Sequence, residues 1–294
     1  MSLEKEIFKK GSTTYYWSSK FFPKKIREDV FKLYSYVRVM DNFVDDIPAQ
    51  PEKLEAAESI RRDFMKAPKN KSQITKNIQI PNSKFQILTP QETRVVQNIV
   101  DLSEKYQFEE KWLQAFYYSM KWDADEREYQ SLNDTLEYIY GSAEVIGLIM
   151  SKILGLKDEA MYAAQMQGRA MQFINFLRDI DEDNNLGRCY FPKTHLKKFS
   201  LTDLSKETAE KNRTKFKEFM SFELERYESW QKEAYKGFVY IPKRYRIAIA
   251  TAVDGYNWTA EQIKKYPLIV FQQKIKPKKY QLFLWRLHNS LRYS

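Results

Sequence analysis

The chain has 294 residues and a formal net charge of +10. Its single cysteine excludes an internal disulfide, and one cysteine with two histidines cannot supply the four ligands of a structural zinc site. Glycine (8) and proline (10) are scarce, so the composition predicts an all-α protein rather than a turn-rich all-β protein. The positive charge favours an anionic partner, such as nucleic acid, a diphosphate or an acidic membrane surface.

Apolar residues at steps of three and four predict helices along most of the chain. In order, these cover residues 24–46, 52–66, 91–106, 109–122, 132–155 and 158–184, with two or three more between 201 and 263. A polar stretch with three prolines, residues 67–91, interrupts them. We expect this stretch to be an exposed connection inside a single domain that spans residues 1–294.

The chain ends in a basic amphipathic tail, residues 280–294. We expect the tail to pack on the body, with contact to a membrane surface as the second option. No apolar run approaches the ~20 residues that span a bilayer, and the N-terminus lacks the apolar core of a signal peptide. The sequence therefore predicts a cytoplasmic protein, either soluble or associated with a membrane surface.

Two acid segments are the most informative feature of the chain. Asp41 and Asp45 lie four residues apart, as do Asp179 and Asp183, and each pair falls at the predicted C-terminal end of a helix. Like charges at this spacing repel by ~0.2–0.5 kcal/mol, and the negative end of the helix dipole penalises each by ~0.3–1 kcal/mol. Because the chain does this twice, we expect each pair to bind a cation.

Polar side chains share a helical face with each acid pair. Tyr34 and Arg38 precede the first pair; Gln172 and Asn175 precede the second, which Arg178 flanks. Carboxylates suit Mg²⁺, which takes one or two of them and bridges to phosphates, so the arginines would complete a diphosphate clamp. A single pair is better explained as a solvated helix face, but two similar pairs favour a site. Three further acids lie off these faces and are expected to be solvated or supporting: Asp46, Asp181 and Glu182.

Four segments occur in a characteristic order. They are Gly11-Ser-Thr-Thr14 with Phe22-Pro23; Tyr34-x3-Arg38-x2-Asp41-x3-Asp45-Asp46; Tyr138-Ile-Tyr-Gly-Ser-Ala-Glu-Val-Ile-Gly147; and Gln172-x2-Asn175-x2-Arg178-Asp179-x3-Asp183-x3-Gly187-Arg188-x-Tyr190-x-Pro192. Together they resemble the squalene and phytoene synthases, the head-to-head trans-prenyl transferases, and most closely the phytoene synthases. A weaker likeness extends to about residue 279. Ala143-Glu144 departs from the Ala-Gly of many relatives, and Lys274 stands where arginine is often found.

The resemblance implies a terpenoid synthase fold, a single all-α bundle around a central cavity. It implies that Mg²⁺, or Mn²⁺ as the alternative ion, is bound with isoprenyl diphosphates by four ligands: Asp41, Asp45, Asp179 and Asp183. The diphosphate contacts it implies are Ser12, Thr13, Thr14, Arg38, Gln172, Asn175, Arg178 and Lys274. The side chains it implies near the reacting carbons are Tyr34, Tyr190 and Tyr256.

The function implied is that of a phytoene synthase. Two geranylgeranyl diphosphates would join head to head through a cyclopropylcarbinyl diphosphate to give phytoene and diphosphate. The alternative in the same class is a squalene, dehydrosqualene or presqualene diphosphate synthase acting on farnesyl diphosphate, with NADPH needed only for squalene. The chain lacks a Gly-x-Gly-x-x-Gly loop, which favours the product that needs no hydride.

Two further alternatives belong to other classes of protein. An inactive relative that serves as an assembly factor is disfavoured because all four aspartates are present. A nucleic-acid-binding protein is disfavoured because no such motif is found and the acid pairs would be unexplained. The sequence leaves open the chain length of the substrate, for which Ala164, Gln167 and Met171 are candidates, and also the stereochemistry of the product, the oligomeric state and the extent of membrane association.

Overall fold

The computed structural model of the chain describes residues 2–66, 87–125 and 127–293. Helices and short helical turns make up the secondary structure of these residues, and no strand occurs among them. The all-α prediction is therefore confirmed. Most of the expected exposed connection at 67–91 lies outside the described residues; near its end, the next helix begins at Pro90.

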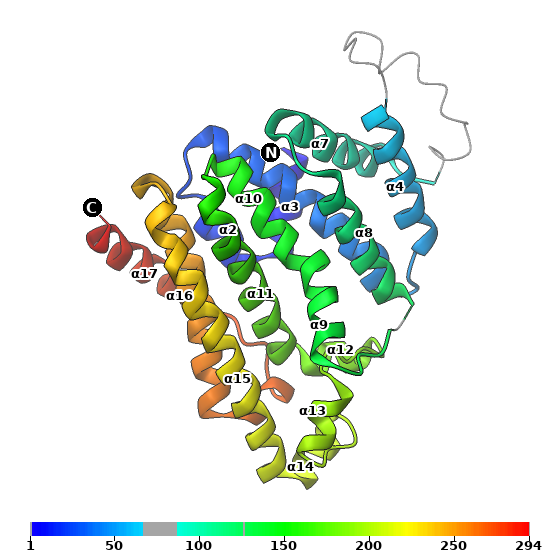
Figure 1. Cartoon of the computed structure of the whole chain (residues 1–294), viewed down its shortest axis with the longest axis vertical. Helices are drawn as coiled ribbons and strands as arrows, with labels where there is room; N and C mark the ends of the chain where they lie inside the picture. Colours follow the sequence, from blue (N-terminus) through cyan, green and yellow to red (C-terminus); the bar gives the residue numbers. More distant parts are fainter. Residues whose placement is uncertain (1, 67–86, 126, 294) are drawn as a thin grey trace.

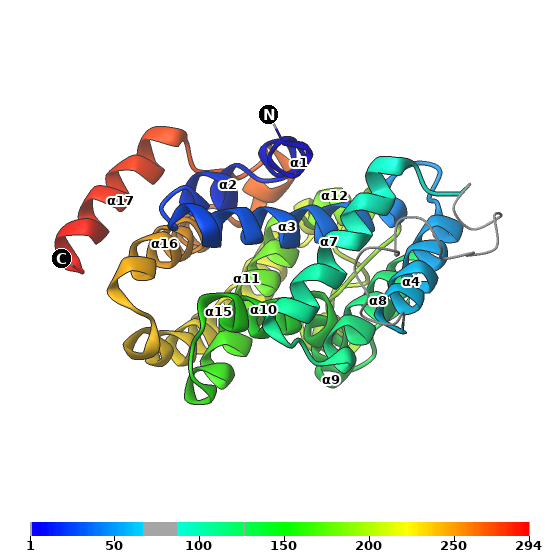
Figure 2. The same cartoon turned by 90° about the horizontal axis from the view of Figure 1, so that it is seen from above.

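The helices form one bundle, shown from two directions in Figures 1 and 2. The α-helices are α1 (Leu3–Gly11), α2 (Thr13–Ser19), α3 (Lys24–Asp45), α4 (Pro51–Lys66), α7 (Pro90–Tyr106), α8 (Glu110–Ala124), α9 (Leu132–Ile139), α10 (Val145–Leu154), α11 (Met161–Arg178), α12 (Ile180–Asn185), α13 (Lys193–Lys198), α14 (Lys206–Lys211), α15 (Arg213–Tyr235), α16 (Lys243–Lys265) and α17 (Lys279–Arg292). Four shorter turns connect some of them: η1 (Tyr140–Glu144), η2 (Asp158–Ala160), η3 (Lys236–Tyr240) and η4 (Pro267–Phe271).

Four of the predicted helices are confirmed to within two residues at each end, namely α3, α4, α7 and α8. α7 illustrates why such ends are predictable, because Thr89 and Glu92 form a reciprocal capping box at its start. The periodicity did not predict α1, α2 or α13. These helices have 9, 7 and 6 residues, too few for a repeat of 3.6 residues to be recognised.

The predicted helix at 132–155 contains a wider π-helical turn, η1. Gly141 in this turn lies directly against α8, since a Cβ atom there would be 2.2 Å from the carbonyl oxygen of Ala115. Ser119 of α8 donates a hydrogen bond to the carbonyl of Tyr138 at 3.0 Å. π-helical turns widen a helix locally, and this one brings its backbone onto α8.

The predicted helix at 158–184 breaks at Asp179, where φ is −101° and ψ is 16°. Arg178 forms a bidentate ion pair with this neighbouring carboxylate, 2.7 Å from Nε to Oδ1. Adjacent side chains do not face each other on a continuous helix, so the pair accompanies the break. The expectation that both acid pairs end a helix is therefore wrong for the second pair. Asp183 lies in the first turn of α12, where the helix dipole favours acids.

α11 lies inside the bundle and packs against α10, α15 and α16. The buried apolar side chains form two clusters, one built mainly by α1 to α10 and the other by α9 and α11 to α16. Tyr15 of α2 and Met171 of α11 pack against both clusters. The phenol of Tyr15 donates a hydrogen bond to the sulfur of Met171 at 3.1 Å, so these two residues mark the junction.

η1 and α11 approach each other closely. A Cβ atom on Gly168 would lie 2.4 Å from the carbonyl oxygen of Ala143, so only glycine fits at that point of α11. The residue after Ala143 is Glu144. It is buried and forms an ion pair with Arg169 of α11, 2.6 Å from Oε1 to Nε. The departure at Ala143-Glu144 is thus balanced by a cation on the facing helix.

The tail forms α17, which packs against α16 and α2. In both views it lies at the opposite side of the molecule from α4 and α8 (Figures 1 and 2). Across the three described ranges, every helix is too short or too polar to cross a membrane.

Candidate active site

α3 carries the first acid pair at its C-terminal end. Its last turn holds no basic residue that would offset the unfavourable helix dipole. Asp41 is half-buried, and burial together with repulsion from Asp45 raises its pKa to about 7. Asp41 therefore lies in an environment that disfavours negative charge unless a cation is near.

Arg38 lies one turn before the acid pair on the same face of α3. It is half-buried and takes part in none of the ion pairs that the described residues form. Gly11, the last residue of α1, makes room for it: a Cβ atom there would lie 2.6 Å from the Tyr34 hydroxyl and 3.1 Å from Cδ of Arg38. The side-chain stem of Arg38 is therefore packed against α1.

The segment before α2 begins with Ser12, whose hydroxyl accepts a hydrogen bond from the backbone N–H of Tyr15 at 3.2 Å. This bond caps α2 and places Ser12 beside α3, where it also lowers the pKa of Tyr34 against the larger effect of burial. The side chains of Thr13 and Thr14 lie outside the described residues, so their predicted roles stay predictions.

The second polar face is on α11. Asn175 donates a hydrogen bond to the side-chain amide oxygen of Gln172 at 3.4 Å, while its own side-chain oxygen is buried without a hydrogen-bond partner among the described residues. A buried acceptor left unpaired costs ~1–3 kcal/mol. The face therefore keeps one polar atom available for a water or a ligand, close to the Arg178–Asp179 pair that ends α11.

Arg188 joins the two acid segments. It follows α12, and its guanidinium donates to the carboxylate of Asp45 and to the carbonyl oxygen of Val44, both at 2.7 Å. Burial opposes its charge, but Asp123 and the bond to Asp45 hold its pKa above the ordinary value. The end of α3 is thereby fixed beside the segment that follows α12, across 143 residues of sequence.

Asp123 at the end of α8 is a site residue that the sequence analysis missed. Its carboxylate accepts hydrogen bonds from the phenols of Tyr138, at 2.6 Å, and Tyr190, at 2.7 Å. Burial raises its pKa to about 6 despite both bonds and nearby Arg188. A signal for it existed, because Asp123 continues a buried helical face made of Trp112, Phe116 and Ser119.

The carboxylates of both segments influence one another. Burial raises the pKa of Asp183 well above its ordinary value, and repulsion from Asp179 and Asp123 adds to this. Asp183 and Asp41 nevertheless keep accessible surface, since both are half-buried. The two acid segments and Asp123 therefore lie close enough to repel one another. We call Asp41, Asp45, Asp123, Asp179 and Asp183 the acidic cluster.

A pocket of about 150 Å³ opens beside the second segment, between α12 and the loop after η4. Arg178, Asp179 and Lys274 line it, and Lys274 is ion-paired with Glu182. Partial burial lowers the pKa of nearby Lys276, and the positive charges of Lys274 and Arg178 lower it further. Two cations and three carboxylates line this pocket, with Lys276 nearby, and Lys276 was not predicted.

The predicted tyrosines fall into two groups. Burial raises the pKa of Tyr15, and so do the neighbouring phenols of Tyr256 and Tyr34, so these three rings lie together near the end of α11. Tyr190 belongs elsewhere: it stacks on Phe176 with ring centroids 4.3 Å apart and bonds to Asp123. Tyr34 of α3 thus lies near Asp41 and Tyr256 of α16 near Asp179, whereas Tyr190 bonds to Asp123.

The three chain-length candidates on α11 have different surroundings. The Gln167 side chain exchanges hydrogen bonds with Gln231 of α15, at 3.0 and 3.1 Å. The carbonyl oxygen of Ala164 lies against Gly147 of α10. Met171 alone of the three contacts the tyrosine group, through Tyr15. Met171 is therefore the strongest candidate of the three.

The acidic cluster is chemically suited to a hard divalent cation, because its donors are carboxylate oxygens. Within the described ranges, no three acid, histidine or cysteine side chains converge closely enough to enclose one ion. Mg²⁺ does not need such a cage, since it takes one or two carboxylates and keeps several waters. Burial and repulsion between the acids raise the pKa values of Asp41 and Asp183, so a bound cation would favour the charged form of both.

The chain has clear relatives. Residues 8–281 match the family model described as squalene/phytoene synthase. The chain is 32% identical over 252 residues to a 15-cis-phytoene synthase of Enterobacter agglomerans, covering 84% of this chain and 80% of that protein. It is 30% identical over 252 residues to a 15-cis-phytoene synthase of Pantoea ananas, covering 84% of this chain and 77% of that protein.

The crystal structure of a dehydrosqualene synthase in complex with ligand has the same fold. The two structures superpose with a TM-score of 0.72 at 19% sequence identity, over 98% of this chain and 94% of that one. The predicted terpenoid synthase fold is confirmed by this likeness. With the extent of the family match, the chain belongs to the squalene/phytoene synthase family of prenyl-transferring enzymes.

Proposed function

We propose that the chain is a phytoene synthase. It would join two C20 geranylgeranyl diphosphates head to head, through a cyclopropylcarbinyl diphosphate, and release phytoene and two diphosphates. Two protons leave carbon, one as the cyclopropane ring closes and one in the last step. The observation that carries the proposal is the meeting of two Asp-x-x-x-Asp segments at Arg188, in a chain whose relatives include two named 15-cis-phytoene synthases. The geometry favours anionic, metal-bound substrates, and the likeness favours the C20 substrate.

The carboxylates of Asp41, Asp45, Asp179 and Asp183 would hold Mg²⁺, and the same donors accept Mn²⁺. When bound, the metal would neutralise diphosphate oxygens and so make diphosphate a better leaving group. The raised pKa values of Asp41 and Asp183 support these ligands, because a nearby cation would relieve the mutual repulsion of the acids.

Cationic side chains at both segments would bind the diphosphates. Arg38 lacks an ion-pair partner within the described ranges, while Arg178 and Lys274 line one pocket with Lys276 nearby. Each positions charge where a leaving diphosphate develops it, which is the usual source of rate enhancement in such a step. The other proposed diphosphate contacts are Ser12, Thr13, Thr14, Gln172 and Asn175.

Departure of the first diphosphate would leave an allylic cation, which alkylates the double bond of the second substrate. The rings of Tyr34 and Tyr256, which neighbour Tyr15, would face this cation, and aromatic faces stabilise such cations. Tyr190 would act indirectly, through its hydrogen bond to Asp123 of the acidic cluster. Loss of a proton from carbon ends the sequence without a reductant, so this function needs no NADPH.

A squalene-type reaction on C15 farnesyl diphosphate is the alternative within the family. The test incubates the purified protein and Mg²⁺ with labelled C15 or C20 diphosphate, with and without NADPH, and identifies the hydrocarbons by mass. We expect a C40 product from the C20 substrate, in the same yield with or without NADPH. Consumption of the C15 substrate alone would overturn the substrate assignment and leave the prenyl-transfer assignment standing.

A further inference from the structure

α17 is attached to the bundle by one narrow face. Leu282 and Asn289 are buried there, and Asn289 donates a hydrogen bond to the carboxylate of Asp254 on α16 at 2.6 Å. Trp285 lies on the same side, with its ring centroid 6.5 Å from that of Trp258. These contacts span two turns, so they fix both the position and the rotation of α17.

The opposite face of α17 is apolar and points to solvent. Tyr280, Phe283, Leu284 and Leu287 follow the spacing of one helical face, and their side chains are 60, 58, 55 and 51% exposed. A helix that served only to pack on the bundle would turn this face inward. A row of large exposed apolar side chains that is held in place indicates a surface that binds something.

The apolar surface continues into a groove between α17, α2 and α16. This hollow of about 390 Å³ is lined by Lys20, Phe21, Ile247, Phe283, Arg286 and Leu287. Arg286 lies over the ring of Phe21, 4.5 Å from its centroid. Basic and apolar groups therefore alternate on one continuous surface, which we call the α17 surface.

The C-terminal segment that forms α17 is basic. Residues 262–294 contain eight Lys or Arg and no Asp or Glu. None of the four basic residues in or next to α17 forms an ion pair within the part of the chain that the structure describes: Lys278, Lys279, Arg286 and Arg292. Two copies of this surface would repel each other, and a nucleic acid would leave the apolar row in water. An anionic lipid surface satisfies both the charge and the apolar row.

We propose that α17 docks the protein on the surface of a bilayer that contains anionic lipids. The helix lies in the plane of the bilayer, with Phe283, Leu284 and Leu287 among the acyl chains and the basic side chains among the headgroups. The purpose of this docking rests on the proposed function, because prenyl chains and a C40 hydrocarbon partition into lipid. The family match ends at residue 281, so most of α17 lies beyond it.

The first test measures co-sedimentation of the full chain with phosphatidylcholine vesicles, with and without about 30 mol% of the anionic lipid phosphatidylglycerol. We expect binding to the anionic vesicles only, weakened by salt. The double variant Phe283→Ser/Leu287→Ser should lower the partition coefficient by more than about tenfold, since it removes two large apolar side chains. Tyr118→Ser, which removes an exposed aromatic on α8, is the matched control and should bind like the unmodified chain.

The second test separates charge from apolar area. Lys279→Gln/Arg286→Gln should lower the partition coefficient on anionic vesicles by about tenfold or more, because each basic group near the headgroups contributes ~1 kcal/mol. The control variant Lys215→Gln/Lys217→Gln removes two exposed charges from α15 and should change binding little. Circular dichroism should show unchanged helix content in all variants.

Three results would overturn the proposal: no binding to anionic vesicles, binding unaffected by Phe283→Ser/Leu287→Ser, or a dimer in solution that this variant dissociates. The last result would assign the surface to a second copy of the chain. Turnover of C20 diphosphate dispersed in detergent should be equal in the double variant and the unmodified chain. Vesicle binding without any turnover would contradict the proposed function alone, so the two failures are distinguishable.

Discussion

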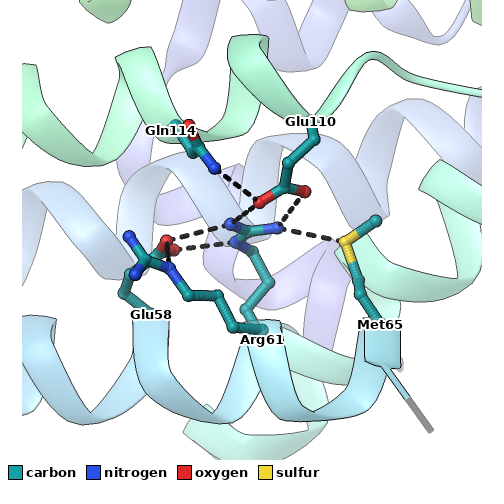
Figure 3. A network of polar contacts seen from close by, with 6 residues as sticks. Glu58, Arg61, Met65, Glu110 and Gln114 are labelled. Carbon is teal, nitrogen blue, oxygen red and sulfur yellow. Dashed lines mark hydrogen bonds and ion pairs between the residues drawn. The ribbon is translucent and has the colours of Figure 1, made fainter.

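Two charged networks in this molecule differ in how well their charges are balanced. Between α4 and α8, the guanidinium of Arg61 is fully buried and bonds to Glu58 and Glu110, in each case at 2.7 Å at the closest (Figure 3). Its third contact is the sulfur of Met65 at 3.0 Å, and Gln114 donates to Glu110. The bond to Arg61 lowers the pKa of Glu110, so here the fold stabilises the charged form.

The acidic cluster shows the opposite behaviour. It gathers five aspartates but pairs only two of them with arginines, Asp45 with Arg188 and Asp179 with Arg178. Burial raises the pKa of the others, to about 7 for Asp41 and to about 6 for Asp123. Arg61 thus stabilises the charged form of Glu110, whereas burial disfavours the charged forms of Asp41, Asp123 and Asp183.

Neutralising Asp41 is expected to have the largest effect on the acidic cluster. We expect Asp41→Asn to lower turnover of the isoprenyl diphosphate at least a thousandfold (about 4 kcal/mol), because a metal ligand is lost. Its melting temperature should equal or exceed that of the unmodified chain, because one repelling charge is gone. Asp46→Asn is the matched control: Asp46 is exposed and should tolerate the change within about threefold. Full activity in Asp41→Asn would contradict the metal assignment.

The reciprocal change is made in the balanced network. Arg61→Ala should lower the free energy of unfolding by about 3 kcal/mol, because it leaves buried Glu58 without its main partner. Turnover per folded molecule should stay the same. Arg62→Ala provides the control, since Arg62 bonds to the same Glu58 from a position that is 42% exposed, and its loss should cost under about 1 kcal/mol. Urea unfolding measures both, and equal effects would contradict the role of burial.

Supplying the missing cation should also distinguish the two networks. Mg²⁺ with inorganic diphosphate should stabilise the chain by about 1.4 kcal/mol when present at ten times its dissociation constant. The variant Asp41→Asn should lose most of this gain, and Arg61→Ala should retain it. Thermal denaturation with and without the ligands gives the comparison. An equal shift of the melting temperature in both variants would mean that Mg²⁺ and diphosphate bind outside the acidic cluster.

The smallest expected effect is on the pH dependence of stability. The folded pKa of Asp41, about 7, lies above its ordinary value of 3.8, so the folded chain holds the extra proton between these values. The stability from this site is therefore present at low pH and lost as the pH rises through 7. With chelator present, Asp41→Asn should show a flatter stability profile between about pH 5 and pH 7 than the unmodified chain. Parallel profiles would contradict the raised pKa.

The sequence predicted the parts of the site that follow from local helix geometry. The face of α3 with Tyr34, Arg38, Asp41 and Asp45 depends only on a repeat of 3.6 residues, and α3 ends within one residue of its predicted end. The broken helix at Asp179 was not predictable in this way, because the break accompanies an ion pair between adjacent side chains. Periodicity contains no information about such a contact.

The parts that joined the two segments were also beyond the sequence. Arg188 and Asp123 lie far from α3 in the sequence, and their roles arise from tertiary contacts. Asp123 was still detectable in principle, as an acid that continues an otherwise apolar helical face. A carboxylate at such a position must find partners inside the fold, so helices of this kind should be searched for acids as well as for apolar residues.

The bond between Arg188 and Asp45 also sets an order of events during synthesis. At roughly 5–20 residues per second, the ribosome needs roughly 7–30 s to travel from one to the other. During this interval α3 ends in carboxylates that have no guanidinium to hold them. The newly made N-terminal half therefore exposes an acidic helix end to water. The candidate active site is completed only after the ribosome has added residue 188.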